Sequence, residues 1–185
     1  MIRLIAGLVA ILPAIVVFAG AIAGSETPRK RSLLEDIGFK RLFGWPPNEH
    51  DVLRLLHEFN MVQLRSYGLA ETRGDERIRQ FAATQAEQAR QREIEIGRLN
   101  MFGLLNINFA PDPSLIRRNE LAGLQGEVGA AFIRDYLDNQ KEDIDGAIGL
   151  LRRYLLHPDN DDVRRFAKQQ LPQLEQAREE LLKLK

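Results

Sequence analysis

Two stretches of the chain repeat one pattern: residues 75–82 read DERIRQFA, and residues 160–167 read NDDVRRFA. Each begins with Asp or Asn, and an aliphatic residue, a phenylalanine and an alanine follow at the same spacing. Asp75 and Asn160 are typical helix N-caps, because their side-chain oxygens can accept hydrogen bonds from the free amides of a first turn. The repeat therefore predicts two similar helical units, each with a helix that begins at one of these residues.

Around these two starts, apolar residues recur at helical spacing from Asp51 to Leu184. Four stripes result: Val52, Leu55, Leu56, Phe59, Val62 and Ala70; Ile78, Phe81, Ala82, Ala89, Ile96 and Leu99; Ile133, Tyr136, Leu137, Ile144, Ala147, Leu151, Tyr154 and Leu155; and Val163, Phe166, Ala167, Leu174, Ala177, Leu181 and Leu184. Strand-like alternation is confined to a brief run at 105–109. The pattern predicts four helices.

The breaks between these helices predict their arrangement. Within each pair the break is short, at Gly74-Asp75 and at residues 157–160, so the two helices of a pair run antiparallel. Between the pairs, Met101 to Pro113 is apolar and irregular, and Asp112-Pro113-Ser114 opens a further helix. We therefore expect an all-α fold: an antiparallel four-helix bundle of the ferritin-like type, built from two similar hairpins with a long crossover.

The N-terminus has the features of an export signal. Arg3 is followed by an uncharged run, Leu4 to Ala23, and small residues suited to a signal peptidase stand at Ala21 and Ala23. The run is also long enough for a membrane anchor, and the basic residues 29–31 leave the reversed orientation open. We expect a signal peptide or N-terminal membrane anchor at 1–23.

Three parts of the chain are therefore expected: the signal or anchor at 1–23, a connector at 24–50, and the ferritin-like helical bundle domain at 51–185. Within the connector, the apolar residues of 33–45 spread around a helical projection and leave no polar face. This distribution argues against a helix lying on a membrane surface.

Short motifs in both hairpins resemble a bacterial family known as the domain of unknown function four-one-four-two, whose members are described as exported or outer-membrane proteins. The motifs are residues 60–64, 69–70 and 77–82 of the first hairpin, and residues 131–138, 161–167 and 171–172 of the second. The resemblance extends over residues 50 to 184. It implies a ferritin-like bundle, export and no established activity.

This sequence departs from that family at positions where its members often carry histidine. The flanking motifs align those histidines with Ala89, Ile144 and Ala177, which all lie on the apolar stripes. If the family's histidines bind a ligand, the resemblance implies that this chain has exchanged the ligand-binding groups for core-filling side chains.

Four glutamines, Gln63, Gln85, Gln140 and Gln170, project onto the inward stripes of different helices. A buried amide without a hydrogen-bond partner costs roughly 1–3 kcal/mol. One interpretation is a neutral polar layer inside the bundle; the other is that these amides lie at the edge of the stripes and reach water. Gln63 and Gln85 are equally far from Gly74 along the chain, which favours their facing each other.

The residue types that catalysis and metal binding require are poorly represented. The chain has no cysteine and no Glu-x-x-His pair, and His50, His57 and His157 lack the spacing of metal ligands. The glutamates around Glu93 and Glu95 alternate with arginines, which predicts a solvated helix face. We expect solvated histidines, no catalytic residue, no metal site and no cofactor.

Charge limits the partners. The chain has 26 Lys and Arg residues and 26 Asp and Glu residues, so no net field favours nucleic acid. The sequence predicts a non-catalytic exported protein, periplasmic or held in the membrane through residues 4–23, that acts by binding or structural association in the cell envelope. An unknown protein or small ligand could use the crossover Met101–Phe109 or the connector, and homo-oligomers stay open. The alternative is a metal-handling or stress-related ferritin-like protein.

Overall fold

The computed structural model describes residues 46–184, and within them it contains five helices and no strand. The helices are α3 (Glu49–Arg73), α4 (Glu76–Phe102), α5 (Leu115–Gly126), α6 (Gly129–Leu156) and α7 (Asp161–Leu182). The all-helical prediction is confirmed. The predicted signal or anchor and the segment 33–45 lie outside the described residues. None of the helices from α3 to α7 is long and apolar enough to cross a membrane.

Three side chains cap the helices as their chemistry predicts. The side chain of Asp75 accepts a hydrogen bond from the amide of Ile78 at 2.9 Å, and Asn160 Oδ1 accepts from the amide of Val163 at 3.1 Å. Asn48 does the same for the amide of Asp51 at 2.8 Å, so α3 begins at Glu49, just before the predicted start. A cap satisfies amides that the first turn of a helix leaves without a partner. The caps therefore define where α3, α4 and α7 begin.

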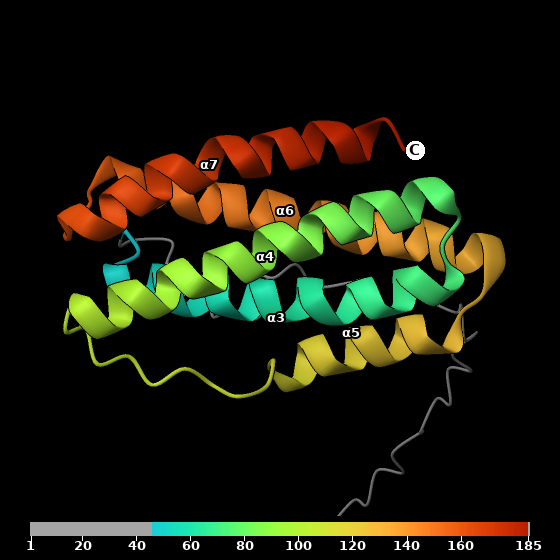
Figure 1. Ribbon diagram of the computed structural model, residues 1–185, viewed down its shortest axis with the longest axis horizontal. Helices are drawn as coiled ribbons and strands as arrows, with labels where there is room; N and C mark the ends of the chain where they lie inside the picture. The colour runs from blue at the N-terminus through green and yellow to red at the C-terminus, as the bar shows by residue number, and fades with distance from the viewer. Residues whose placement is uncertain (1–45, 185) are drawn as a thin grey trace, which may run out of the picture. The chain divides into compact units, whose positions relative to one another are not determined.

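The helices pack as two hairpins (Figure 1). α3 lies against α4 and α6 lies against α7, while α3 also contacts α6 and α4 also contacts α7. The core contains almost every residue of the four predicted stripes; only Leu99, Ile133, Leu155 and Leu184 are partly exposed at its margin. Burial of these faces, at about 25 cal/mol per Å² of apolar surface, is the main stabilising contribution of the hairpins.

α5 is part of the connection between the hairpins and lies against α3 and α6 (Figure 1). Its buried residues are Leu121, Leu124 and the charged Arg117. Arg117 Nη1 lies 2.9 Å from Asp143 Oδ1 of α6. At the other end, Arg73 Nη1 of α3 donates to the carbonyl oxygens of Leu124 and Glu127, at 3.0 and 2.8 Å. Polar contacts from two helices therefore hold α5 in place.

Candidate functional site

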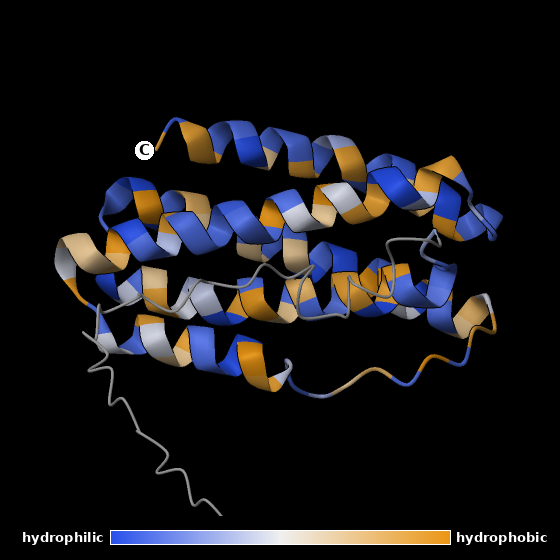
Figure 2. Ribbon diagram, turned by 180° about the vertical axis from the view of Figure 1, so that it is seen from behind, coloured by the Kyte–Doolittle hydropathy of each residue, from blue (hydrophilic) through white to orange (hydrophobic). Residues whose placement is uncertain are grey.

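Three apolar side chains are exposed together where α4 ends. Met101 is 69% exposed, and Phe102 and Leu104 are each 78% exposed. Met101 and Phe102 end α4, and Leu104 lies in the connection to α5, along which further hydrophobic residues follow (Figure 2). Scattered exposed apolar residues are ordinary, but several at adjacent positions are typical of an interaction surface. We call this segment, residues 101–104, the apolar loop.

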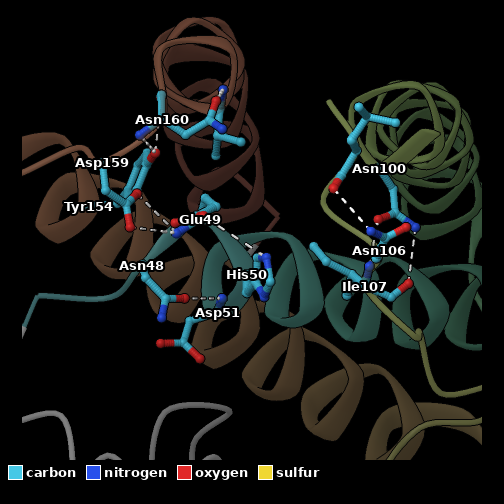
Figure 3. A network of polar contacts seen from close by, with 12 residues as sticks. Asn48, Glu49, His50, Asp51, Asn100, Asn106, Ile107, Tyr154, Asp159 and Asn160 are labelled. Carbon is cyan, nitrogen blue, oxygen red and sulfur yellow. Dashed lines mark hydrogen bonds and ion pairs between the residues drawn. The ribbon is translucent and has the colours of Figure 1, made fainter. Parts of the chain in front are cut away.

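The side chain of Asn100 closes the base of this loop (Figure 3). Asn100 Nδ2 donates to the carbonyl oxygen of Ile107 at 3.0 Å, and Asn100 Oδ1 accepts from the amide of Ile107 at 2.8 Å. The two bonds resemble a backbone pair, and Ile107 itself is buried. The loop is therefore fixed at both of its ends.

Between these ends the backbone is strained. Leu104 and Asn106 have φ angles of 51° and 52°. Asparagine adopts this left-handed region readily, but for leucine it costs about 1 kcal/mol. Strain of this kind persists only where surrounding contacts impose it, and it is concentrated at functional sites. Here it accompanies a leucine side chain that is held out into water.

α3 holds the rest of the connection. His57 Nε2 lies 3.0 Å from the carbonyl oxygen of Ala110, and Glu58 Oε1 accepts from the amide of Ser114 at 2.9 Å. Arg65 forms an ion pair with Asp112. His57 and Glu58 lie on one turn of α3, and Arg65 lies about two turns further on. The connection from Ala110 to Ser114 is therefore held against this helix.

His57 corrects the prediction of solvated histidines. Its Nδ1 lies 2.7 Å from Glu93 Oε2 of α4, and its ring centroid is 4.8 Å from that of Phe109. Both ring nitrogens face acceptors, Glu93 and the carbonyl of Ala110, so the doubly protonated ring satisfies both. The hydrogen bond to Glu93 raises the pKa of His57, and burial opposes the rise. Glu93 is correspondingly half-buried and paired, where the sequence predicted a solvated face.

The same end of the molecule carries a second set of polar contacts (Figure 3). The amide of Glu49, at the start of α3, donates to Asp159 Oδ1 at 3.1 Å. The hydroxyl of Tyr154, near the end of α6, donates to the carbonyl oxygen of Asn160 at 3.2 Å. The first bond joins the beginning of α3 to the α6–α7 turn, and the second holds that turn against the end of α6. The apolar loop therefore projects from an end of the molecule that hydrogen bonds stabilise.

All four predicted glutamines are buried, with 1–3% of each exposed. Gln140 Nε2 donates to Ser66 Oγ of α3 at 3.1 Å, and Gln170 Nε2 donates to Glu95 Oε2 of α4 at 3.0 Å. Within residues 46–184 neither amide atom of Gln63 or Gln85 has a hydrogen-bond partner. No hydrogen bond joins any two of the four in this part of the chain, so the glutamines are interior but make separate contacts.

Sequence reasoning missed the buried charges. Arg92 is completely buried on α4, and Asp143 on α6 is 1% exposed. Burial raises the pKa of Asp143 to about 7, against the lowering effect of the Arg117 guanidinium. Helical periodicity could have predicted the burial of Arg92, because this residue lies between Ala89 and Ile96 on the same apolar stripe. Nothing in the spacing indicates which residue pairs with it.

At the positions that the family resemblance singled out, Ala89 and Ile144 are 0% exposed and Ala177 is 1% exposed. All three are therefore core residues, as predicted. In the part of the chain from 46 to 184, no group of three or more His, Asp or Glu side chains is placed to hold a metal ion.

The fold and this surface define an all-helical protein of two packed hairpins that presents an apolar loop held by its neighbours. The family described as Domain of unknown function (DUF4142) matches residues 46–184, and the chain belongs to that family. This range coincides with the helical region that the structure describes. No curated protein and no solved structure matches the chain.

Proposed function

We propose that this chain is a non-catalytic exported protein that works by binding or structural association in the cell envelope, with the apolar loop as its contact surface. The supporting observation is the exposure of Met101, Phe102 and Leu104 on a loop that Asn100 closes. The backbone of this segment is already fixed by the Asn100–Ile107 hydrogen bonds, so a partner would have to order only the side chains. Their burial contributes about 25 cal/mol per Å² to association.

We also infer that α3, α4, α6 and α7 form an antiparallel four-helix bundle of the ferritin-like type, with α5 inside its crossover. In support, each hairpin packs against the other through two helix pairs, and the second helix of each begins at the repeated motif. For export, the support is the uncharged run from Leu4 to Ala23 with small residues at Ala21 and Ala23.

Site-specific crosslinking tests the contact surface. A photoreactive phenylalanine analogue replaces Phe102 in the full chain, in cells that produce it. The matched control carries the analogue at Leu182, which is 46% exposed on α7 at the other end of the helices (Figure 1). We expect a discrete adduct from position 102 that disappears with Leu104→Ser, and none from position 182. Equal labelling from both positions, or no adduct from position 102, would refute the proposal.

The mass of the adduct identifies the kind of partner, and a product of twice the chain's mass means a second copy. Cell fractionation tests export: we expect the chain in the envelope fractions, and a purely cytoplasmic chain contradicts the export proposal. Stoichiometric iron or zinc in the purified protein would instead favour the metal-handling alternative.

A further inference from the structure

Residues 108–111, in the middle of the connection between α4 and α5, are held against α3 by one side chain. His57 Nε2 lies 3.0 Å from the carbonyl oxygen of Ala110, and within residues 46–184 no second hydrogen bond reaches this segment. The Phe109 ring lies beside the imidazole, with the two ring centres 4.8 Å apart, and is partly buried against the core. The position of this segment therefore depends on the state of one imidazole.

On both sides of this segment the connection is fixed independently of His57. Asn100 forms two hydrogen bonds with the backbone of Ile107, at 2.8 and 3.0 Å. Glu58 Oε1 accepts from the amide of Ser114 at 2.9 Å. A change at His57 is therefore confined to the residues between Ile107 and Ser114, and the apolar loop keeps its closed base.

The contacts of the His57 ring require a proton on each nitrogen. Nδ1 lies 2.7 Å from Glu93 Oε2, and Glu93 Oε1 accepts from Asn60 Nδ2 at 2.6 Å, so the carboxylate is held in place. An ionised carboxylate and a carbonyl oxygen are acceptors only, and a neutral imidazole has a single N–H group to donate. The hydrogen bond to the charged carboxylate is the stronger one. A neutral ring therefore keeps Glu93 and turns a lone pair of Nε2 toward the carbonyl oxygen of Ala110.

The charged groups that act on the ring are both acidic. They are Glu93 of α4 and Glu58 of α3 itself, while the connection presents only the uncharged carbonyl of Ala110 and the ring of Phe109. The hydrogen bond to Glu93 raises the pKa of His57 above its ordinary value of 6.5, and burial opposes the rise. The ring thus loses its proton as the pH rises through a range above 6.5.

The remaining helices pack on other faces. Ser66, which receives Gln140 of α6, follows His57 by nine residues (66 − 57 = 9), about two and a half turns, and so lies on the opposite side of α3. Arg73, which holds the end of α5, follows by sixteen residues (73 − 57 = 16), about four and a half turns, and lies on that opposite side too. α7 packs against α4 and α6. The imidazole therefore faces α4 and the connection.

We propose that His57 is a pH-dependent switch on the connection: the protonated imidazole holds residues 108–111 against α3, and the neutral imidazole releases them. Release lets the Phe109 ring leave its place beside the imidazole and turn into water. The chain carries no charged residue from Leu99 to Pro111, so the released segment adds to the uncharged apolar surface at this end of the molecule. The switch operates whether or not the apolar loop has a partner.

A spin label on the segment tests the switch. The chain has no cysteine, so Asn108→Cys, at an exposed position, gives a single site for a nitroxide in the purified full chain. Electron paramagnetic resonance measures the mobility of the label against pH, and NMR of the same protein measures the titration of the His57 ring. We expect the ratio of mobile to immobile label to rise at least about tenfold with increasing pH, as the loss of a hydrogen bond to a charged group predicts. The midpoint should equal the pKa of His57.

The matched control carries the label at Met101→Cys, which is also exposed but lies on the loop that Asn100 closes, and its mobility should not change with pH. Adding His57→Gln to Asn108→Cys should remove the pH dependence, because an amide does not titrate. The comparison of the two midpoints uses the natural histidine, so it decides the question even if that variant fails to fold. Mobility at position 108 that is independent of pH, that follows another midpoint or that still changes in His57→Gln would overturn the proposal, as would an equal change at position 101.

Discussion

At the scale of single residues, the apolar interior of this protein contains a few buried charged groups that form contacts between helices. Arg117 and Asp143 join α5 to α6 under almost complete burial, at 3% and 1% exposure. Such a pair contributes little net stability, because removing both charges from water costs about as much as their attraction returns. It does strongly disfavour any arrangement in which one partner is left without the other.

The first prediction concerns this pair. At pH 8, above the pKa of about 7 that burial gives Asp143, we expect Asp143→Leu to cost about 3 kcal/mol in the free energy of unfolding. Breaking a buried ion pair usually costs about 3–5 kcal/mol. We expect the lower value because Glu120 Oε2, 2.6 Å from Arg117 Nη1, still balances the arginine's charge. Adding Arg117→Met should recover most of the loss. Urea denaturation measures both, and a double variant as unstable as the single one would contradict the argument.

The second prediction concerns His57. Because its folded pKa lies above the ordinary value of 6.5, the stability it contributes is fully present below pH 6.5. That stability is lost as the pH rises through the raised pKa. We expect His57→Gln to cost roughly 1–3 kcal/mol at pH 6 and less at pH 9. Urea denaturation at both pH values measures the change, with exposed His157→Gln as the control. A cost that grows from pH 6 to pH 9 would show the sign to be wrong.

At the scale of the elements, local chemistry explains where the helices begin and end. α3, α4 and α7 each begin after a side-chain cap, at Asn48, Asp75 and Asn160. α3 ends at Arg73, and its C-cap Gly74 has a steric reason to be glycine, since a methyl group there would lie 2.7 Å from the carbonyl oxygen of Ala70 and 2.8 Å from Ile78 Cγ2. The turn of the first hairpin is therefore as tight as its backbone permits.

The third prediction follows from the glycines inside helices. Gly68 in α3 and Gly97 in α4 have open space where a side chain would lie. Replacing either with alanine should stabilise the protein by about 0.5–1 kcal/mol, because glycine loses more backbone freedom on folding. Gly74→Ala is the control and should be destabilising. Thermal unfolding of the three variants checks the order, and equal midpoints for Gly68→Ala and Gly74→Ala would count against it.

At the scale of the whole molecule, the two hairpins and α5 are held by different forces. The hairpins share a continuous apolar core, while α5 contributes only Leu121 and Leu124 as buried apolar residues and otherwise depends on Arg73 and Arg117. The free energy of local unfolding differs between the parts of a protein, and elements with few buried contacts unfold first. α5 is therefore the helix that can unfold locally with the smallest loss of buried apolar contacts.

The fourth prediction tests this order of stability. Arg73→Met removes the donor that satisfies the carbonyls at the end of α5, and hydrogen bonds to charged groups contribute roughly 1.5–3 kcal/mol. We expect amide hydrogen exchange in α5 to accelerate at least about tenfold while α4 stays unchanged. Arg77→Met, which removes a hydrogen bond to Lys183 on the surface, is the control. An equal acceleration in all helices would mean that α5 opens only with the whole fold.

The sequence alone determined α3, α4, α6 and α7, the residues at which α4 and α7 begin, and most of the apolar residues on their buried faces. It predicted four helices, and the separate helix α5 makes five in the described part of the chain. Helical periodicity and N-capping depend on residues a few positions apart, so they can be recognised without knowing the fold. Residues such as Ile96 and Leu174 are buried because of where they stand on a stripe, whichever helix covers them.

The tertiary structure alone decided which polar groups meet. Arg92 reaches Asn60, His57 lies between Glu93 and Ala110, and Arg117 meets Asp143 only because separate helices bring them together. The apolar loop likewise depends on contacts that Asn100 and α3 make around it. Hydrogen bonds and ion pairs act over a few ångströms and in fixed directions. Partners distant in the chain are therefore specified by packing geometry, which periodicity does not contain.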